Sequence, residues 1–126
     1  MHKSKLAGLI IDCQTDDLPA AARFWSEALG LPVDDSPGGQ DERYVDLLYP
    51  HNALHLEVQK VEHPSRVHLD IETDDVEAEV ERLELLGAKR VQQVKTWWVM
   101  EAPTGQRFCV VRVQNSNFEE MATVWE

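Results

Sequence analysis

The chain has only two cysteines, few basic residues and no long apolar run. Cys13 and Cys109 each lie inside a strand-like apolar stretch rather than in a spaced disulfide framework, which predicts buried free thiols in a reducing compartment. The apolar run over residues 6–11 is too short for the core of a signal peptide and is followed at once by Asp12. No stretch approaches the length that crosses a membrane. We therefore expect a cytoplasmic protein that does not use a membrane.

The scarcity of basic residues gives the protein a strong negative charge. Twelve lysines and arginines stand against 23 acidic residues, for a formal net charge of -11 over 126 residues. Such a field repels the phosphates of nucleic acids and anionic lipids, so neither is expected as a partner. Solubility explains the charge more simply than recruitment of a cationic ligand does. The apolar content of 43% and the charged content of 28% are ordinary for a globular protein, and the length fits one domain over residues 1–126.

The sequence contains an internal repeat. The pattern of residues 10–17 recurs in residues 68–75, and each copy is followed by an apolar stretch of helical periodicity that stops at a glycine, Gly30 or Gly87. Neither module is large enough to cover its own sheet face, so the two are expected to pair around a shared concave surface. The matched pairs are Asp12 and Asp70, Thr15 and Thr73, Asp16 and Asp74, and Asp17 and Asp75.

Periodicity and turn signals place the secondary structure in the same order in both modules. This order predicts an α+β fold of two βαβββ modules in tandem, over about residues 6–60 and 66–113, whose curled, mostly antiparallel sheet surrounds a cleft with the helices outside. In the tail, residues 114–126, a capping box at 116–119 opens a short segment that docks on this chain or on a second subunit. Residues 34–42 are expected to form an exposed loop. The expected helices cover residues 18–29 and 76–86, and the expected strands cover residues 9–14, 43–49, 53–59, 67–72, 89–94, 96–101 and 107–113, with an extra edge strand near 31–33.

Helices on one side of the sheet leave the opposite strand faces for polar groups. In the second module that face carries His68 and Asp70, and in the first module it carries His55 and Glu57. A wet sheet face explains each residue taken singly, but the duplication favours a common hollow into which His68 and Glu57 point. A histidine next to a carboxylate binds a divalent metal or carries out acid–base chemistry. We expect His68 and Glu57 to be the catalytic or metal-binding pair.

Further side chains complete the expected pocket. Trp97 and Trp98 are adjacent on a strand and must point to opposite faces, so one belongs to the core and the other to the pocket wall, and the sequence does not choose between them. The pocket residues expected besides the pair are Asp12, Gln14, His55, Gln59, Asp70, Trp97, Trp98 and Cys109.

Four short segments of the second module carry a family resemblance. They are residues 67–71 (VHLDI), 74–76 (DDV), 86–88 (LGA) and 108–111 (FCVV). Together they resemble the glyoxalase-like branch of the vicinal oxygen chelate superfamily, which includes glyoxalases, extradiol dioxygenases, and fosfomycin- and bleomycin-resistance proteins. With a counterpart in the first module, the resemblance spans about residues 6–113.

The resemblance also indicates where a metal would bind. In metal-dependent members each module provides one ligand from its first strand and one from its last, usually a histidine and then a glutamate. The corresponding positions here are Ile10 and His68 on the first strands and, on the last strands, Cys109 and either Glu57 or, if the register slips by one pair, Gln59. Only His68 and Glu57 are conventional ligands, and Asp12 or Asp70, one strand pair away, substitutes only if the backbone shifts. This favours a metal-free site over a zinc, nickel or manganese site, and a Cys109 thiolate would favour zinc.

Two functions are compatible with these features. The first is a lyase or isomerase that moves a proton next to a carbonyl group of an oxygen-rich metabolite through His68 and Glu57. The second is a binding protein of the bleomycin-resistance type, whose acidic, aromatic-lined groove holds a cationic drug or metabolite without chemistry. The superfamily supports both on one scaffold, so the fold alone does not decide. The resemblance and the apolar side of the tail both predict a homodimer.

Overall fold

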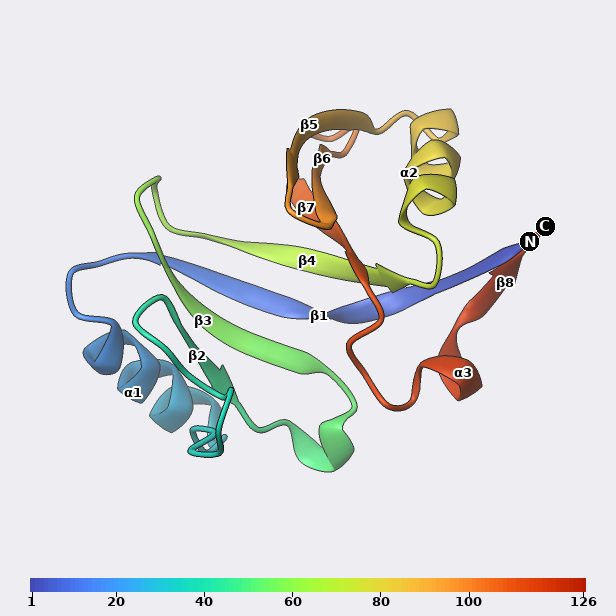
Figure 1. Ribbon diagram of the computed structural model, residues 1–126. Helices are drawn as coiled ribbons and strands as arrows, with labels where there is room; N and C mark the ends of the chain where they lie inside the picture. Colours follow the sequence, from blue (N-terminus) through green and yellow to red (C-terminus); the bar gives the residue numbers. More distant parts are fainter. The chain divides into compact units, whose positions relative to one another are not determined.

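Eight β-strands and three α-helices make up the computed structural model, which describes all 126 residues (Figure 1). The architecture is α+β, as predicted. Contacts between residues divide the chain into two units, the 9–67 unit and a terminal unit that combines residues 1–8 with residues 68–126. Strand β1 (His2–Gln14) contributes its first half to the terminal unit and its second half to the 9–67 unit. None of the three helices combines the length and the apolar character needed to cross a bilayer.

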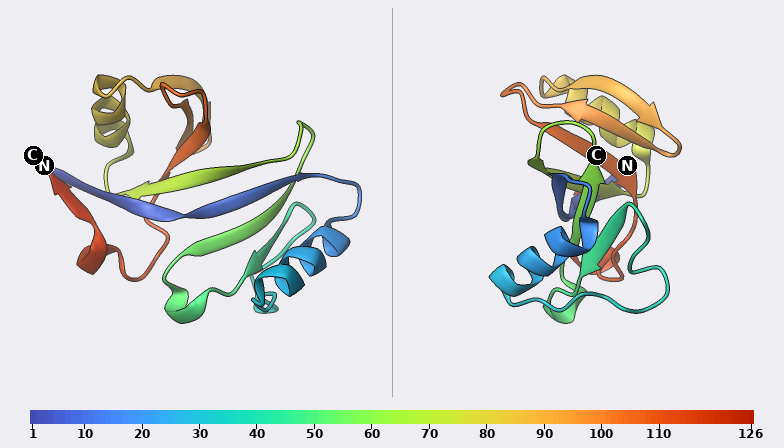
Figure 2. Two further views of the ribbon diagram at one scale, coloured as in Figure 1. Left: turned by 180° about the vertical axis from the view of Figure 1, so that it is seen from behind. Right: turned by 90° about the vertical axis from the view of Figure 1, so that its left-hand side faces the viewer.

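The 9–67 unit places one helix on a small sheet. Helix α1 (Leu18–Leu29) has the predicted bounds, and it ends at Gly30, whose φ of 70° is left-handed and suits glycine. Strands β2 (Tyr44–Leu47) and β3 (His55–Val61) form an antiparallel hairpin against which α1 packs (Figure 2). The buried core of this unit consists of Ile11, Leu18, Ala22, Val45, Leu47, Leu56 and Val58.

The terminal unit also places a helix on a sheet. Helix α2 (Val76–Leu85) packs on three strands, β5 (Lys89–Val94), β6 (Trp97–Glu101) and β7 (Arg107–Arg112). Strands β5, β6 and β7 are antiparallel neighbours, whereas β7 is parallel to β4 (Arg66–Thr73). Figure 1 shows α2 beside the β5–β7 sheet. The buried core of this unit consists of Val80, Leu83, Met100 and Val110, with Ile71, Val76, Ala88, Trp98 and Phe108 packed against it.

The two copies of the repeat begin their helices in the same way. Thr15 Oγ1 accepts a hydrogen bond from the N–H of Asp17 at 3.0 Å, and Thr73 Oγ1 accepts one from the N–H of Asp75 at 3.1 Å. Asp17 and Asp75 then cap α1 and α2, because each carboxylate accepts a hydrogen bond from the N–H three residues later, at 3.1 and 3.0 Å. In each module, the matched Thr and Asp residues of the repeat therefore mark the point where a strand ends and a helix begins.

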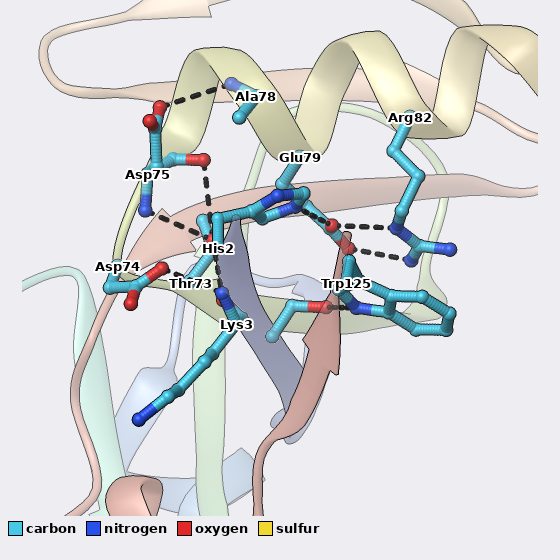
Figure 3. Close-up of polar contacts among 10 residues, drawn as sticks. His2, Lys3, Thr73, Asp74, Asp75, Ala78, Glu79, Arg82 and Trp125 are labelled. Atoms are coloured by element: carbon cyan, nitrogen blue, oxygen red, sulfur yellow. Dashed lines mark hydrogen bonds and ion pairs between the residues drawn. The ribbon is translucent and has the colours of Figure 1, made fainter.

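A buried carboxylate ties both chain ends to α2 (Figure 3). Glu79 is fully buried, and it receives two hydrogen bonds of 2.8 Å from the Arg82 guanidinium and one of 2.8 Å from His2 Nε2. Burial alone would raise the pKa of Glu79, but hydrogen bonds from Arg82, His2 and Ser4 lower it overall. The Arg82 guanidinium also lies 3.7 Å from the centre of the Trp125 ring, and Trp125 Nε1 donates to Ser4 Oγ.

The tail differs from its predicted form. Strand β8 (Thr123–Trp125) is not anticipated by the sequence, and it pairs with residues 2–4 of β1, so the tail docks on its own chain. Helix α3 (Phe118–Met121) begins after Asn117, and no side chain caps it. The predicted capping box at 116–119 therefore does not form. Burial of Phe118 in the same chain holds the helix instead.

Three smaller differences concern turns and edges. The turn between β2 and β3 is a short 3₁₀ helix, η1 (Pro50–Asn52), with a positive φ at His51 and at Asn52. The expected edge strand near residues 31–33 is a single bridge between Val33 and Leu47. Leu86, placed by periodicity on the buried stripe of α2, is 66% exposed because it lies at the C-terminal cap.

Replacing Glu79 by alanine should lower the free energy of unfolding by about 3 kcal/mol, because it leaves Arg82 and His2 without their buried partner. Urea unfolding followed by circular dichroism measures the loss. Glu81→Ala is the control, since Glu81 is exposed on the same helix and should change stability by less than about 0.5 kcal/mol. Equal effects of the two substitutions would contradict the importance of this carboxylate.

Candidate functional site

The packing of α1 decides which way the side chains of β3 point. Leu56 and Val58 are buried in the core beneath α1. Successive residues of a strand point to opposite faces, so His55 and Glu57 lie on the other face of the sheet, as predicted. Gln59 follows on that same face, opposite Tyr44 of β2.

A histidine and two carboxylates meet on this face of the 9–67 unit. Asp46 of β2 is the direct cross-strand partner of Glu57. His55 Nε2 lies 3.2 Å from Glu57 Oε1 and 3.6 Å from Asp46 Oδ1. The side chains of the three residues are 18–26% exposed, so they are partly shielded from water. We call them the hairpin cluster.

The hairpin cluster contains a carboxyl group that titrates close to neutral pH. Burial raises the pKa of Asp46 to about 6; His55 opposes this rise, and the negative charge of Glu57 adds to it. A carboxylate with such a pKa is suited to accept a proton at physiological pH. Asp46 was missed at the level of the sequence, although its alternation with the buried Val45 and Leu47 marks the polar face of β2.

A second cluster lies in the terminal unit. Ile71 on β4, and Phe108 and Val110 on β7, pack against the core beneath α2. The alternating residues His68 and Asp70 of β4 and Cys109 of β7 therefore share the opposite face. Cys109 is a free thiol, paired in register with Asp70. One ligand atom from each of these three residues lies within 4.8 Å of the other two, and we call them the strand cluster.

The strand cluster fits a metal ion better than the sequence indicates. Asp70 was expected to act as a ligand only after a backbone shift, yet its carboxylate stands next to His68, with 3.4 Å between Oδ1 and Nε2. This Oδ1 is buried and accepts no hydrogen bond. An orphaned buried oxygen beside an imidazole and a thiol is a suitable donor set for a divalent ion. The hairpin cluster also offers three ligand atoms within 4.8 Å of one another, all of them nitrogen or oxygen.

The remaining predicted pocket residues differ in their burial and in their contacts. Asp12 is 2% exposed and lies 3.9 Å from Arg66 Nε. Gln14 is bound to the loop between β3 and β4, because its side chain donates to the carbonyl of Glu62. Trp98 packs against the core beneath α2, which leaves Trp97 on the opposite strand face. The tryptophan that can face a ligand is therefore Trp97.

Each of the two predicted catalytic residues thus belongs to a cluster within its own unit. Glu57 belongs to the hairpin cluster of the 9–67 unit, and His68 belongs to the strand cluster of the terminal unit. Each lies beside carboxylates on the polar face of its own strand. The joint action of His68 and Glu57 on one ligand stays a prediction.

Comparison with known proteins agrees with the fold. The family model described as a glyoxalase-like domain matches residues 8–111. A hypothetical protein from Bacillus halodurans C-125 has a TM-score of 0.62 at 12% identity, over 90% of this chain and 97% of that chain. Methylmalonyl-CoA epimerase from Mycobacterium tuberculosis has a TM-score of 0.61 at 14% identity, over 86% and 88% of the two chains.

A further similar structure is described by the superfamily to which that protein belongs. It is a glyoxalase/bleomycin resistance protein/dioxygenase superfamily member from Vibrio splendidus 12B01, with a TM-score of 0.50 at 18% identity, over 85% of this chain and 98% of that one. No curated protein matches the sequence. The structural neighbours share the fold at low identity, and the family model covers most of the chain. The chain therefore belongs to the glyoxalase-like domain family.

Proposed function

We propose that the protein is an enzyme of the lyase or isomerase type that moves a proton next to a carbonyl group of a small, oxygen-rich metabolite. The observation that carries the proposal is the hairpin cluster, where Glu57 lies beside His55 and a carboxyl group with a pKa of about 6. A carboxylate that lies beside an imidazole and a second carboxyl group is suited to remove a proton next to a carbonyl. A structural neighbour is named as an epimerase of methylmalonyl-CoA, and epimerisation next to a carbonyl requires removal and return of a proton.

Glu57 is the proposed base. Burial raises the pKa of its neighbour Asp46, and the charge of Glu57 adds to that rise, so a second carboxyl group able to hold a proton lies next to the proposed base. His55 Nε2, 3.2 Å from Glu57, orients the carboxylate.

His68 is the proposed electrophilic group. Its Nε2 lies 3.4 Å from Asp70, and the side chain is 14% exposed, which limits competition from water. An imidazole held in this way stabilises the negative charge that develops on a carbonyl oxygen when the neighbouring carbon loses a proton. That His68 and Glu57 act on the same substrate is part of the proposal.

A second candidate function is ligand binding without chemistry, of the bleomycin-resistance type. A cavity of about 540 Å³ lies between α1 and the segment that leads into β2, with apolar Leu18, Ala22 and Val45 in its lining and four acidic residues against two basic ones, Arg23 and Lys60, among its polar groups. Together with the net charge of -11, this favours a cationic ligand with an apolar body. It ranks second because it gives no role to the two clusters.

We also propose a cytoplasmic homodimer. The two free cysteines support a reducing compartment. Met121 and Val124 in the tail are 63% and 48% exposed and would be covered by a second copy.

Proton exchange in deuterium oxide tests the reaction directly. With methylmalonyl-CoA and simple 3-oxo thioesters as probes, the protein should speed the loss of the proton signal next to the carbonyl, as followed by nuclear magnetic resonance. Glu57→Gln should slow this exchange by about 100-fold or more, and His68→Gln should also slow it. Glu62→Gln, an exposed control in the following loop, should leave the rate unchanged. Exchange no faster than without protein, or an unaffected Glu57→Gln variant, would contradict the proposal, and tight binding without exchange would favour the second candidate.

The raised pKa of Asp46 predicts a specific pH dependence of stability. The carboxyl group has a pKa of about 6 in the folded protein against an ordinary value of 3.8, so the folded state holds the proton more tightly. This contribution to stability is complete below about pH 4 and is lost as the pH rises through about 6. Asp46→Asn removes the dependence, so the variant should gain about 2 kcal/mol relative to the wild type between about pH 4 and pH 7. Urea unfolding at both pH values measures this gain, and a difference that does not change with pH would refute the raised pKa.

Light scattering tests the oligomeric state. A homodimer should give twice the chain mass of 14.4 kDa. A monomer that persists at all concentrations would remove the dimer from the proposal.

A further inference from the structure

The strand cluster is held by two rigid elements. Strands β4 and β7 run parallel, with Asp70 and Cys109 as register partners. His68 precedes Asp70 by two residues and so lies on the same face. Ligands on paired strands keep their separations better than ligands on loops, which is what a metal site requires.

The buried carboxylate of Asp70 has an oxygen that accepts no hydrogen bond, unlike the buried carboxylate of Glu72. The Asp70 side chain is 9% exposed, and its buried Oδ1 accepts no hydrogen bond. Glu72, two residues later on the same strand, is fully buried, but the backbone N–H groups of Gln114 and Asn115 both donate to its Oε1. A buried carboxylate oxygen without a donor is unfavourable unless a cation lies beside it. Of these two carboxylates on β4, Asp70 is therefore the one that has an oxygen available for a cation.

We propose that Asp70 is the third protein ligand of a zinc site that it forms with His68 and Cys109. Two ligand atoms bound to one tetrahedral zinc ion are about 3.4 Å apart, given bonds of about 2.0–2.1 Å, and Asp70 Oδ1 lies 3.4 Å from His68 Nε2. Three protein ligands leave one position open, as in catalytic zinc sites. The sulfur ligand selects zinc over magnesium or manganese, which prefer oxygen.

This ligand set departs from the pattern that the family resemblance implies. In that pattern the last strand of the second module gives a glutamate, and here Cys109 stands at that position. Asp70 restores the carboxylate from the neighbouring strand. The inference rests on the proposed function for the role of the ion, which when bound would supply a Lewis acid for the carbonyl oxygen in place of the His68 imidazole, since His68 would then be its ligand. The binding itself needs no substrate.

Cobalt substitution tests the site in the full-length protein. After removal of metals with a chelator, Co²⁺ added alone should bind one ion per chain and give the near-ultraviolet absorption band of a sulfur–cobalt bond. Zn²⁺ should displace it. Cys109→Ser should abolish the band, whereas Cys13→Ser, the matched control, should keep it, since burial raises the pKa of the Cys13 thiol and that residue lies in the other unit.

The Asp70→Asn variant tests whether Asp70 binds the metal ion or only lies near it. The variant should keep the sulfur band at saturating Co²⁺ but bind Zn²⁺ at least about 100-fold more weakly, because even loss of an outer partner of a ligand costs 10–100-fold. Melting curves of the metal-free variants check that each one folds. Absence of the band in the wild type, its persistence in Cys109→Ser, or unchanged zinc affinity in folded Asp70→Asn would overturn the inference.

The outcomes distinguish the site from the reaction. A normal cobalt spectrum without proton exchange would reject the proposed function and leave the zinc site in place. Proton exchange by the metal-free protein, without any cobalt band, would reject the zinc site and leave the reaction in place.

Discussion

The strict alternation of side chains along paired strands is the constraint on which both clusters depend. On β3, the burial of Leu56 and Val58 beneath α1 forces His55 and Glu57 to the other face. In the terminal unit, the burial of Val110 beneath α2 has the same effect on Cys109. The cores therefore determine where the chemistry lies, although no core residue takes part in it. A slip of one residue in either register would exchange the two sets of side chains.

The repeat preserves architecture more faithfully than chemistry. Thr15 and Thr73, and with them Asp17 and Asp75, make the same hydrogen bonds at the start of the two helices. The first-strand position that carries His68 in the second module carries Ile10 in the first, and Ile10 is 3% exposed. The first module instead gathers its polar groups on the β2–β3 hairpin. Duplication supplied two similar frames, and substitution gave each one a different set of functional groups.

The sequence was sufficient for whatever depends on local pattern. The bounds of α1 and β5, the helix caps and the polar faces of β3 and β4 follow from periodicity, turn residues and alternation. The role of Asp46 could not be found in this way, because it depends on the cross-strand register that places it opposite Glu57. The same holds for Asp70, since only the parallel pairing of β4 with β7 brings it beside Cys109. Strand β8 is three residues long and has no periodicity that a sequence could reveal.

The pairing of β8 with the first residues of β1 has a practical consequence for engineering. His2 and Trp125 are register partners, so the two ends of the chain are neighbours in one small sheet. A short linker could join them, and new ends could be opened in the exposed loop before β2, which carries no residue of either cluster. Such a circularly permuted chain would keep the β1–β8 pairing within one continuous segment and free both old ends from fraying.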